Sequence, residues 1–181
     1  MASSVRKRTR RRKADDPYTD YILVGHDAAA SEGPAARALS TFALYGRDDG
    51  VCTEYLLQRE KREFVASAAD RTAYLHELDE AWAARRDPKE ARAIGAKAPI
   101  DEEAWARERE DVMLALLLHR ETHDPAFCEA LDRTGSCAIL QKGRGEWGMA
   151  FVGGRAQGAN AYGAVLEGVR ASRITASFES G

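Results

Sequence analysis

The chain has 181 residues and a formal net charge of −2, with 44% hydrophobic and 31% charged residues, proportions typical of one globular domain with its own core. No segment approaches the roughly eighteen consecutive apolar residues of a membrane helix, so we expect a cytoplasmic protein without membrane contact. The three cysteines, Cys52, Cys128 and Cys137, lack the spacing of a metal site or a disulfide framework; we interpret them as reduced thiols and expect no metal.

Basic residues are concentrated near the start of the chain. Positions 6 to 13 hold no acidic residue and seven basic ones: Arg6, Lys7, Arg8, Arg10, Arg11, Arg12 and Lys13. The rest of the chain retains 20 basic against 29 acidic residues. Because residues 1 to 16 have almost no apolar side chains, they are predicted to form a disordered basic arm ahead of a folded domain at 17 to 181. Such an arm can bind nucleic-acid phosphates or an acidic partner, or it can serve only to keep the protein soluble.

In the first part of the folded domain, short apolar runs alternate with turn-forming residues. The run Tyr-Ile-Leu-Val at 21 to 24 predicts a strand, and the Ala, Ser, Gly and Pro residues of 27 to 36 predict a loop. A second extended segment is predicted at 39 to 42 and a turn at 46 to 50. The pattern becomes helical from Thr53, whose hydroxyl is suited to cap a helix.

The helix that begins at Thr53 places three polar residues on one face. Glu54, Gln58 and Lys61 are spaced i, i+4 and i+7, which brings their side chains to the same side of a helix. Such a face is commonly a solvated ladder of ion pairs, each worth about 0.2–0.5 kcal/mol. The spacing by itself favours that interpretation over a chemically active site.

Helical patterns dominate the middle of the chain. The predicted helices cover residues 68 to 86, 88 to 97, 101 to 122 and about 125 to 133. Apolar residues at i, i+4 and i+8, as in Tyr74, Leu78 and Trp82, predict one buried side. Asp101 and Asp124 precede helix starts and are predicted caps.

The last third of the chain clusters glycines beside an indole and an amide. A short strand is predicted at 137 to 140, Trp147 and Gly148 follow, and a helical pattern opens at 158 to 163 and ends at Arg170. Glycines in this position allow a close approach to a ligand, which predicts a pocket wall, or they only make turns around a core tryptophan. Short strands, a helical middle, then strand, loop and helix predict a helix-rich α+β single domain with a few short strands.

Taken together, these motifs resemble the NADAR superfamily, the YbiA-like N-glycosidases, over residues 39 to 170. The similar segments are Leu39-Ser40-Thr41-Phe42 to the family's LSNF, residues 54 to 61 to EHxxQxxK, residues 105 to 113 to WxxxKxxVM, Asp124-Pro125 with Thr134-Gly135 to NP and TG, Trp147-Gly148 to WG, and residues 158 to 170 to GxNxxGxxLxxVR. The order and spacing of the motifs make the resemblance specific, and it implies a YbiA-like α+β fold.

The chain departs from the family pattern at four places. Tyr55 stands where the family has a histidine after the glutamate, and Thr41 stands for the asparagine of LSNF. Arg120-Glu121 replaces a Lys-Phe pair, and Glu146 occupies a shortened segment that lacks the family's aspartate. These departures leave open a catalytically degenerate protein that binds ADP-ribose, a nucleotide or nucleic acid without turnover.

The resemblance implies hydrolysis of an N-glycosidic bond between a ribose and a base. The implied substrates are ADP-ribose attached to guanine in nucleic acid, or a ribosylated nucleotide metabolite such as a ribosylaminopyrimidine phosphate of the riboflavin pathway. The basic arm favours the nucleic acid, because each contact with a phosphate gains from counterion release. No cofactor is implied.

The resemblance also assigns roles to residues of the motifs. Glu54, with Glu146 in place of the family's aspartate, stabilises the sugar or activates water, while Lys61 protonates the leaving base or forms a Schiff base with the opened sugar. Trp105 and Trp147 are implied to stack on the base. Arg109 and the start of the last helix are implied to bind phosphate. Gln58, Gly148 and Asn160 are the other implied substrate-binding residues.

Overall fold

The computed structural model of the protein describes residues 21–25, 33–46, 50–143, 145–152 and 155–179. The basic arm predicted at 1 to 16 lies outside these residues. Contacts divide the chain into two compact units, each described by itself below. The central unit is Leu44–Arg120, and the terminal unit combines Met1–Ala43 with Glu121–Gly181.

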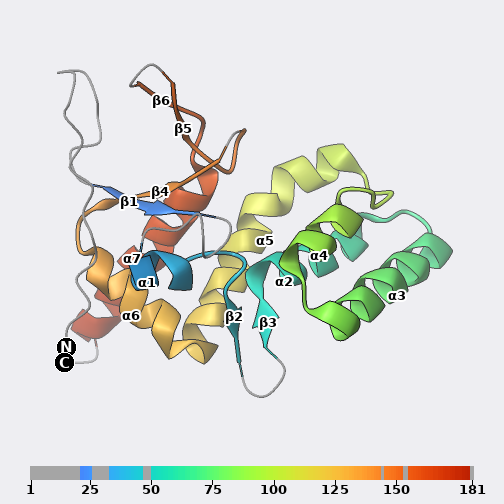
Figure 1. The fold of residues 1–181 in the computed structure, drawn as a ribbon, viewed down its shortest axis with the longest axis horizontal. Coiled ribbons are helices and arrows are strands. Elements are labelled where there is room, and N and C mark those ends of the chain that lie inside the picture. The colour runs from blue at the N-terminus through green and yellow to red at the C-terminus, as the bar shows by residue number, and fades with distance from the viewer. Residues whose placement is uncertain (1–20, 26–32, 47–49, 144, 153–154, 180–181) are drawn as a thin grey trace. The chain divides into compact units, whose positions relative to one another are not determined.

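The terminal unit contains short strands and three helices among its described residues (Figure 1). They are β1 (Tyr21–Val24), α1 (Gly33–Ala38), α6 (Pro125–Thr134), β4 (Ala138–Gln141), β5 (Ala150–Val152), β6 (Arg155–Gln157) and α7 (Ala161–Glu179). Strand β1 pairs with β4 in parallel, with Tyr21 opposite Ala138 and Val24 opposite Gln141. Strands β5 and β6 form an antiparallel hairpin.

Helix α7 packs directly on β4, and Gly163 explains the close approach. A Cβ atom on Gly163 would lie 2.1 Å from the carbonyl oxygen of Ile139, so only glycine fits. The hydroxyl of Tyr162 donates to the carbonyl oxygen of Leu39 at 2.7 Å. Leu166 and Val169, one and two turns further on, are fully buried. The apolar stripe of α7 therefore covers β4.

The central unit begins with a two-strand ribbon and continues as helices (Figure 1). Its elements are β2 (Leu44–Tyr45), β3 (Val51–Cys52), α2 (Thr53–Glu60), a 3₁₀ turn (Lys61–Phe64), α3 (Ala68–Arg85), α4 (Pro88–Gly95) and α5 (Glu102–His123), whose last three residues belong to the terminal unit. Strands β2 and β3 are antiparallel. None of the described helices combines the length and the apolar character that crossing a membrane demands.

The starts of α3, α4, α5 and α6 follow the capping chemistry of the sequence, and that of α2 differs from it. Ser67, Asp87, Asp101 and Asp124 each accept a hydrogen bond from a backbone amide in the first turn of the helix that follows. At α2, however, the cap is the thiol of Cys52 rather than Thr53, with its sulfur 3.4 Å from the amide nitrogen of Tyr55. Burial raises the pKa of the Cys52 thiol to about 12, so it remains protonated and serves packing.

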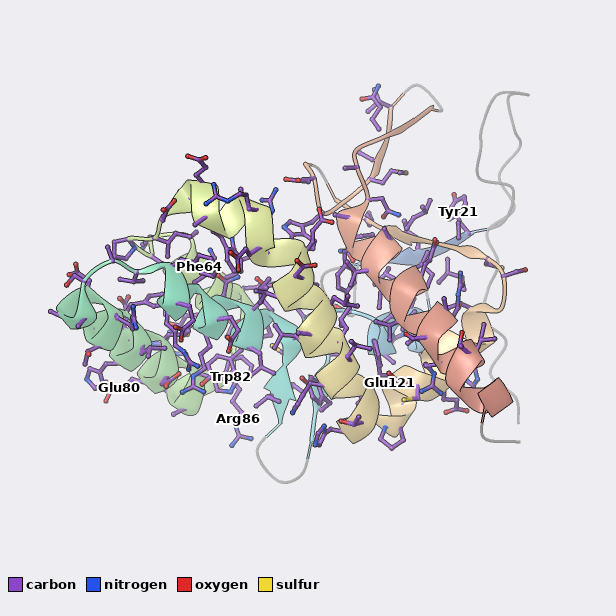
Figure 2. The ribbon with its side chains drawn as sticks, turned by 180° about the vertical axis from the view of Figure 1, so that it is seen from behind. Tyr21, Phe64, Glu80, Trp82, Arg86 and Glu121 are labelled. Carbon is purple, nitrogen blue, oxygen red and sulfur yellow. The ribbon has the colours of Figure 1, made fainter. Side chains whose placement is uncertain are left out.

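Aromatic contacts hold α2 against α3 and the 3₁₀ turn against α5. Tyr55 stacks on Trp82 with ring centroids 4.4 Å apart and an interplanar angle of 11°. Phe64 meets the Trp105 ring edge to face at 5.2 Å; Phe64 and Trp82 are labelled in Figure 2. Pairs of this kind contribute about 0.5–1.5 kcal/mol beyond the burial of their area.

Three predictions about secondary structure were wrong. Residues 39 to 42 form a turn instead of an extended segment, because the amide of Ala43 donates to the carbonyl oxygen of Ser40 and the Ser40 hydroxyl accepts from Phe42. Part of the predicted loop at 27 to 36 belongs to α1. The last helix continues past Arg170, since no glycine or proline follows to stop it. The predicted α+β class is confirmed, with the strands short and the helices dominant.

The contact between α7 and β4 yields a test of the fold. Gly163→Ala should lower the free energy of unfolding by about 1–3 kcal/mol, because the new methyl group meets backbone that cannot move aside. Gly168→Ala is the matched control, since no atom lies within 4 Å of its Cβ position. Urea titration followed by circular dichroism measures both. Equal midpoints for the two variants would contradict the close packing.

Candidate active site

The polar face of α2 is buried. Glu54 is 2% exposed and Gln58 is 5% exposed, so the solvated ladder of ion pairs that the spacing favoured is wrong for these two residues. The Nε2 atom of Gln58 donates to the Oε1 atom of Glu54 at 2.8 Å. A charged group is costly to remove from water unless it is paired, so the carboxylate requires such partners.

Helix α4 supplies a second partner to the carboxylate. The Nε atom of Arg92 lies 3.5 Å from the same oxygen of Glu54, and the Arg92 side chain is 44% exposed. The Arg92 guanidinium therefore contacts the buried acid while part of its side chain remains in solvent. Sequence reasoning missed Arg92, because an arginine on a short amphipathic helix is indistinguishable from an ordinary surface charge until the helix is placed.

Lys61 lies at the start of the 3₁₀ turn, next to the same helix. Its Nζ atom donates to the carbonyl oxygen of Gly95 at 2.8 Å and lies 5.6 Å from the centroid of the Trp105 ring. Burial lowers the pKa of the Lys61 ammonium, and the nearby carboxylates of Glu102 and Glu54 offset part of that effect. A partly buried amine of this kind is more easily deprotonated than a surface lysine, as a nucleophile or proton carrier requires.

Helix α5 contributes Trp105 and Arg109. Trp105 is buried against Phe64 and lies beside the Lys61 ammonium, so protein groups already cover parts of its ring. Arg109 lies one turn further along and is partly buried. Stacking of a base on Trp105 and phosphate binding by Arg109 stay predictions.

In the terminal unit, the segment before β5 docks on the start of α7. The carbonyl oxygens of residues 146, 147 and 148 accept hydrogen bonds from the amides of Ala161, Tyr162 and Asn160, at 3.0, 3.4 and 3.3 Å. Glu146 is exposed, Trp147 is partly buried and Gly148 is buried. Because these amides at the start of α7 are already engaged, they do not offer the free anion site that was predicted there.

Asn160 fastens α7 to β4 through both ends of its side-chain amide. Its Oδ1 atom accepts from the amide of Gln141 at 2.8 Å, and its Nδ2 atom donates to the carbonyl oxygen of Ile139 at 2.9 Å. Asn160 also has a φ of 57°, in the left-handed region that asparagine tolerates better than most residues. These contacts give Asn160 a structural role, and its contact with substrate stays a prediction.

Glycines in this part of the chain permit close backbone packing. A Cβ atom on Gly158 would lie 2.2 Å from the carbonyl oxygen of Gly148, and one on Gly148 would lie 2.8 Å from the Cα atom of Gly143. The structure thus accounts for Gly148 and Gly158 without a ligand.

Beside them is a hollow of about 490 Å³, and its lining residues are Gly145, Glu146, Ala150, Val152, Gln157, Gly158 and Ala159. Small and apolar groups form most of its wall. Glu146 is the acidic residue among these lining groups. The hollow is where the sequence predicted a pocket wall of glycines, but Trp147 and Asn160 are not among the residues that line it.

The predicted site residues therefore fall into two clusters. Glu54, Gln58, Lys61 and Trp105 are brought together in the central unit, where Arg92 and Gly95 join them. Glu146, Trp147, Gly148 and Asn160 are brought together in the terminal unit. The described residues hold no group of three His, Cys, Asp or Glu side chains arranged to bind a metal.

The environment of Lys61 predicts its titration. Lys61 should have a pKa below the ordinary lysine value of 10.5, and Glu102→Gln should lower it further by removing a carboxylate that stabilises the ammonium. NMR titration of the lysine side-chain carbons measures both effects. The control is Glu103→Gln, since Glu103 pairs with Arg107. An ordinary Lys61 pKa in the wild type, or the same response to both variants, is incompatible with this environment.

Comparison with known proteins supports the fold. No model of a protein family matches the chain, and no curated protein matches it by sequence. The structure is similar to the NMR structure of the Escherichia coli protein YbiA, with a TM-score of 0.60 and 18% sequence identity over 87% of this chain and 88% of that one. At this level of identity the likeness establishes the fold, and the chain has the YbiA-like α+β fold that its motifs predicted.

Proposed function

We propose that the protein is an N-glycosidase that hydrolyses the bond between a ribose and a base, with ADP-ribose on guanine in nucleic acid as its substrate. The observation that carries the proposal is that a buried acid and a partly buried amine belong to the same cluster of side chains. Glu54 and Lys61 are both held by side-chain or backbone hydrogen bonds within one cluster of the central unit. The motif resemblance and the YbiA-like fold support the same assignment.

The buried carboxylate suits the sugar side of the reaction. Breaking the C1–N bond builds positive charge at C1 of the ribose and negative charge on the leaving base. In a site of low dielectric constant, a carboxylate stabilises the cation more strongly than it would in water. Glu54 can do this directly, or it can take a proton from the attacking water. Gln58 and Arg92 hold the carboxylate in place.

The amine suits the base side or the opened sugar. As an ammonium, Lys61 donates a proton to the leaving base, so that the base departs neutral. As a neutral amine, Lys61 can instead attack C1 and displace the base, which takes up the proton that the amine loses; the ribosyl-lysine then opens to a Schiff base, and water hydrolyses it to release the sugar and the free lysine. A lowered pKa serves both roles, because it makes the proton easier to give up.

The motif resemblance implies Glu146, Trp147, Gly148 and Asn160 of the terminal unit as substrate contacts, and these stay predictions. The Trp105 ring already contacts Phe64 and the Lys61 ammonium, so less of it is open to stack on a base. Glu146 replaces the family's aspartate in this proposal and lines the hollow beside the β5–β6 hairpin. Asn160 and Gly148 fix the backbone on which Glu146 and Trp147 lie, through their hydrogen bonds at the start of α7.

Incubation with an oligonucleotide carrying ADP-ribosylated guanine tests the function, with release of ADP-ribose followed by chromatography. Glu54→Gln and Lys61→Ala should each lower kcat/KM by about 10²–10⁴-fold. Glu108→Gln and Lys97→Ala are matched controls at exposed positions and should retain activity. Wild-type rates in both Glu54→Gln and Lys61→Ala would falsify the assignment.

A second candidate function is nucleic-acid binding without turnover. Tyr55, in place of the family's histidine, donates to the carboxylate of Asp79 at 2.8 Å and stacks on Trp82. Burial and the Asp79 carboxylate raise its pKa to about 12, so Tyr55 cannot exchange protons near neutral pH as a histidine can. This substitution favours a degenerate site, and the seven basic residues of the arm then supply the affinity.

Deletion of residues 1 to 13 tests the second candidate. If the arm holds nucleic acid, the full chain should bind single- or double-stranded DNA with an affinity that falls steeply with salt. The deleted chain should lose most of that affinity and most of the salt dependence. Fluorescence anisotropy measures both. Binding that is insensitive to salt, or unchanged by the deletion, rules this function out.

A further inference from the structure

We propose that Gly95, the last residue of α4, is a positioning residue for Glu54. By carrying no side chain, it leaves the space in which the Gln58 amide bonds the Glu54 carboxylate. The inference rests on the proposed function for its kinetic readout.

The space in question is already filled by Gln58. A Cβ atom on Gly95 would lie 1.9 Å from the Oε1 atom of Gln58 and 2.5 Å from its Cδ atom. Gly95 is helical and does not have a positive φ, so its backbone would accept alanine without strain. The neighbour, and not the backbone conformation, is therefore what requires glycine here.

The end of α4 is fixed, so it cannot easily retreat. The carbonyl oxygen of Gly95 accepts from the Lys61 ammonium at 2.8 Å, a favourable contact for a cation at a helix C-terminus. Ala91 and Ile94 of the same helix are buried in the core cluster of the central unit. The main chain of Gln58 is equally constrained, because the Tyr74 hydroxyl donates to its carbonyl oxygen at 2.5 Å. The Gln58 side chain is therefore the part that would move.

If Gln58 yields, the carboxylate loses a partner. The Nε2 atom of Gln58 donates to the Oε1 atom of Glu54 at 2.8 Å, and rotation of the Gln58 amide away from Gly95 breaks that bond. Arg92 is then the described partner that remains on that oxygen. A methyl group on residue 95 would thus act on the acid through Gln58, with little effect on the rest of the fold.

The test compares four proteins: the wild type, Gly95→Ala, Gln58→Ala and the double variant. Gly95→Ala should lower kcat by about tenfold to a hundredfold with KM little changed, as expected when a catalytic group is displaced by about 1 Å. Gln58→Ala should show a similar loss. The double variant should be no worse than Gln58→Ala, because the methyl group then has room.

A structural readout keeps the inference separate from the proposed function. In the wild type, the buried side-chain amide of Gln58 should exchange its protons slowly in NMR spectra, and in Gly95→Ala at least about tenfold faster. Gly168→Ala, a helical glycine with open space around it, should leave that exchange unchanged. Slow Gln58 exchange in Gly95→Ala, or additive losses in the double variant, overturns the inference. If the wild type shows no turnover, the proposed function fails and the exchange measurement still decides the role of Gly95.

Discussion

The candidate site depends on the cost of burying one carboxylate. Glu54 lies in the first turn of α2, almost wholly removed from water, where an unpaired charge costs several kcal/mol. The cost is offset by the amide of Gln58, the guanidinium of Arg92 and the favourable end of the α2 dipole. A protein that only needed a stable helix would place an apolar residue there, since that substitution is often neutral or stabilising. The stability of α2 alone therefore does not explain a glutamate at this position.

Helix α4 links the parts of this arrangement. Arg92 contacts the acid, and Gly95, one turn later, contacts the Lys61 ammonium through its carbonyl oxygen and Gln58 through its bare Cα atom. Helix α4 thus contacts the Glu54 carboxylate, the Gln58 amide that bonds it, and the Lys61 ammonium. Its own position is set by Ala91 and Ile94 in the core and by the Asp87 cap at its start.

Local chemistry made much of the fold predictable from sequence. Capping residues such as Ser67, Asp101 and Asp124 are local signals, and the helices they start lie where expected. The spacing of Glu54, Gln58 and Lys61 also placed them together. It could not distinguish a buried face from a solvated one, because burial depends on what packs against the helix. Arg92 and Gly95 were missed for the same reason: their importance arises from a contact between α4 and α2, and no local pattern encodes it.

The two units differ in how their contacts are distributed along the chain, and this has a consequence during synthesis. The central unit is encoded by one continuous stretch, so its contacts become possible as soon as residue 120 has left the ribosome. In the terminal unit, by contrast, Tyr162 bonds Leu39 across 123 positions, and β1 waits for β4 before it can pair. Closing such distant contacts is slow, because the entropy of the intervening chain is lost first. Nascent β1 therefore carries an unpaired apolar edge until β4 emerges, an interval in which a chaperone has the most to protect.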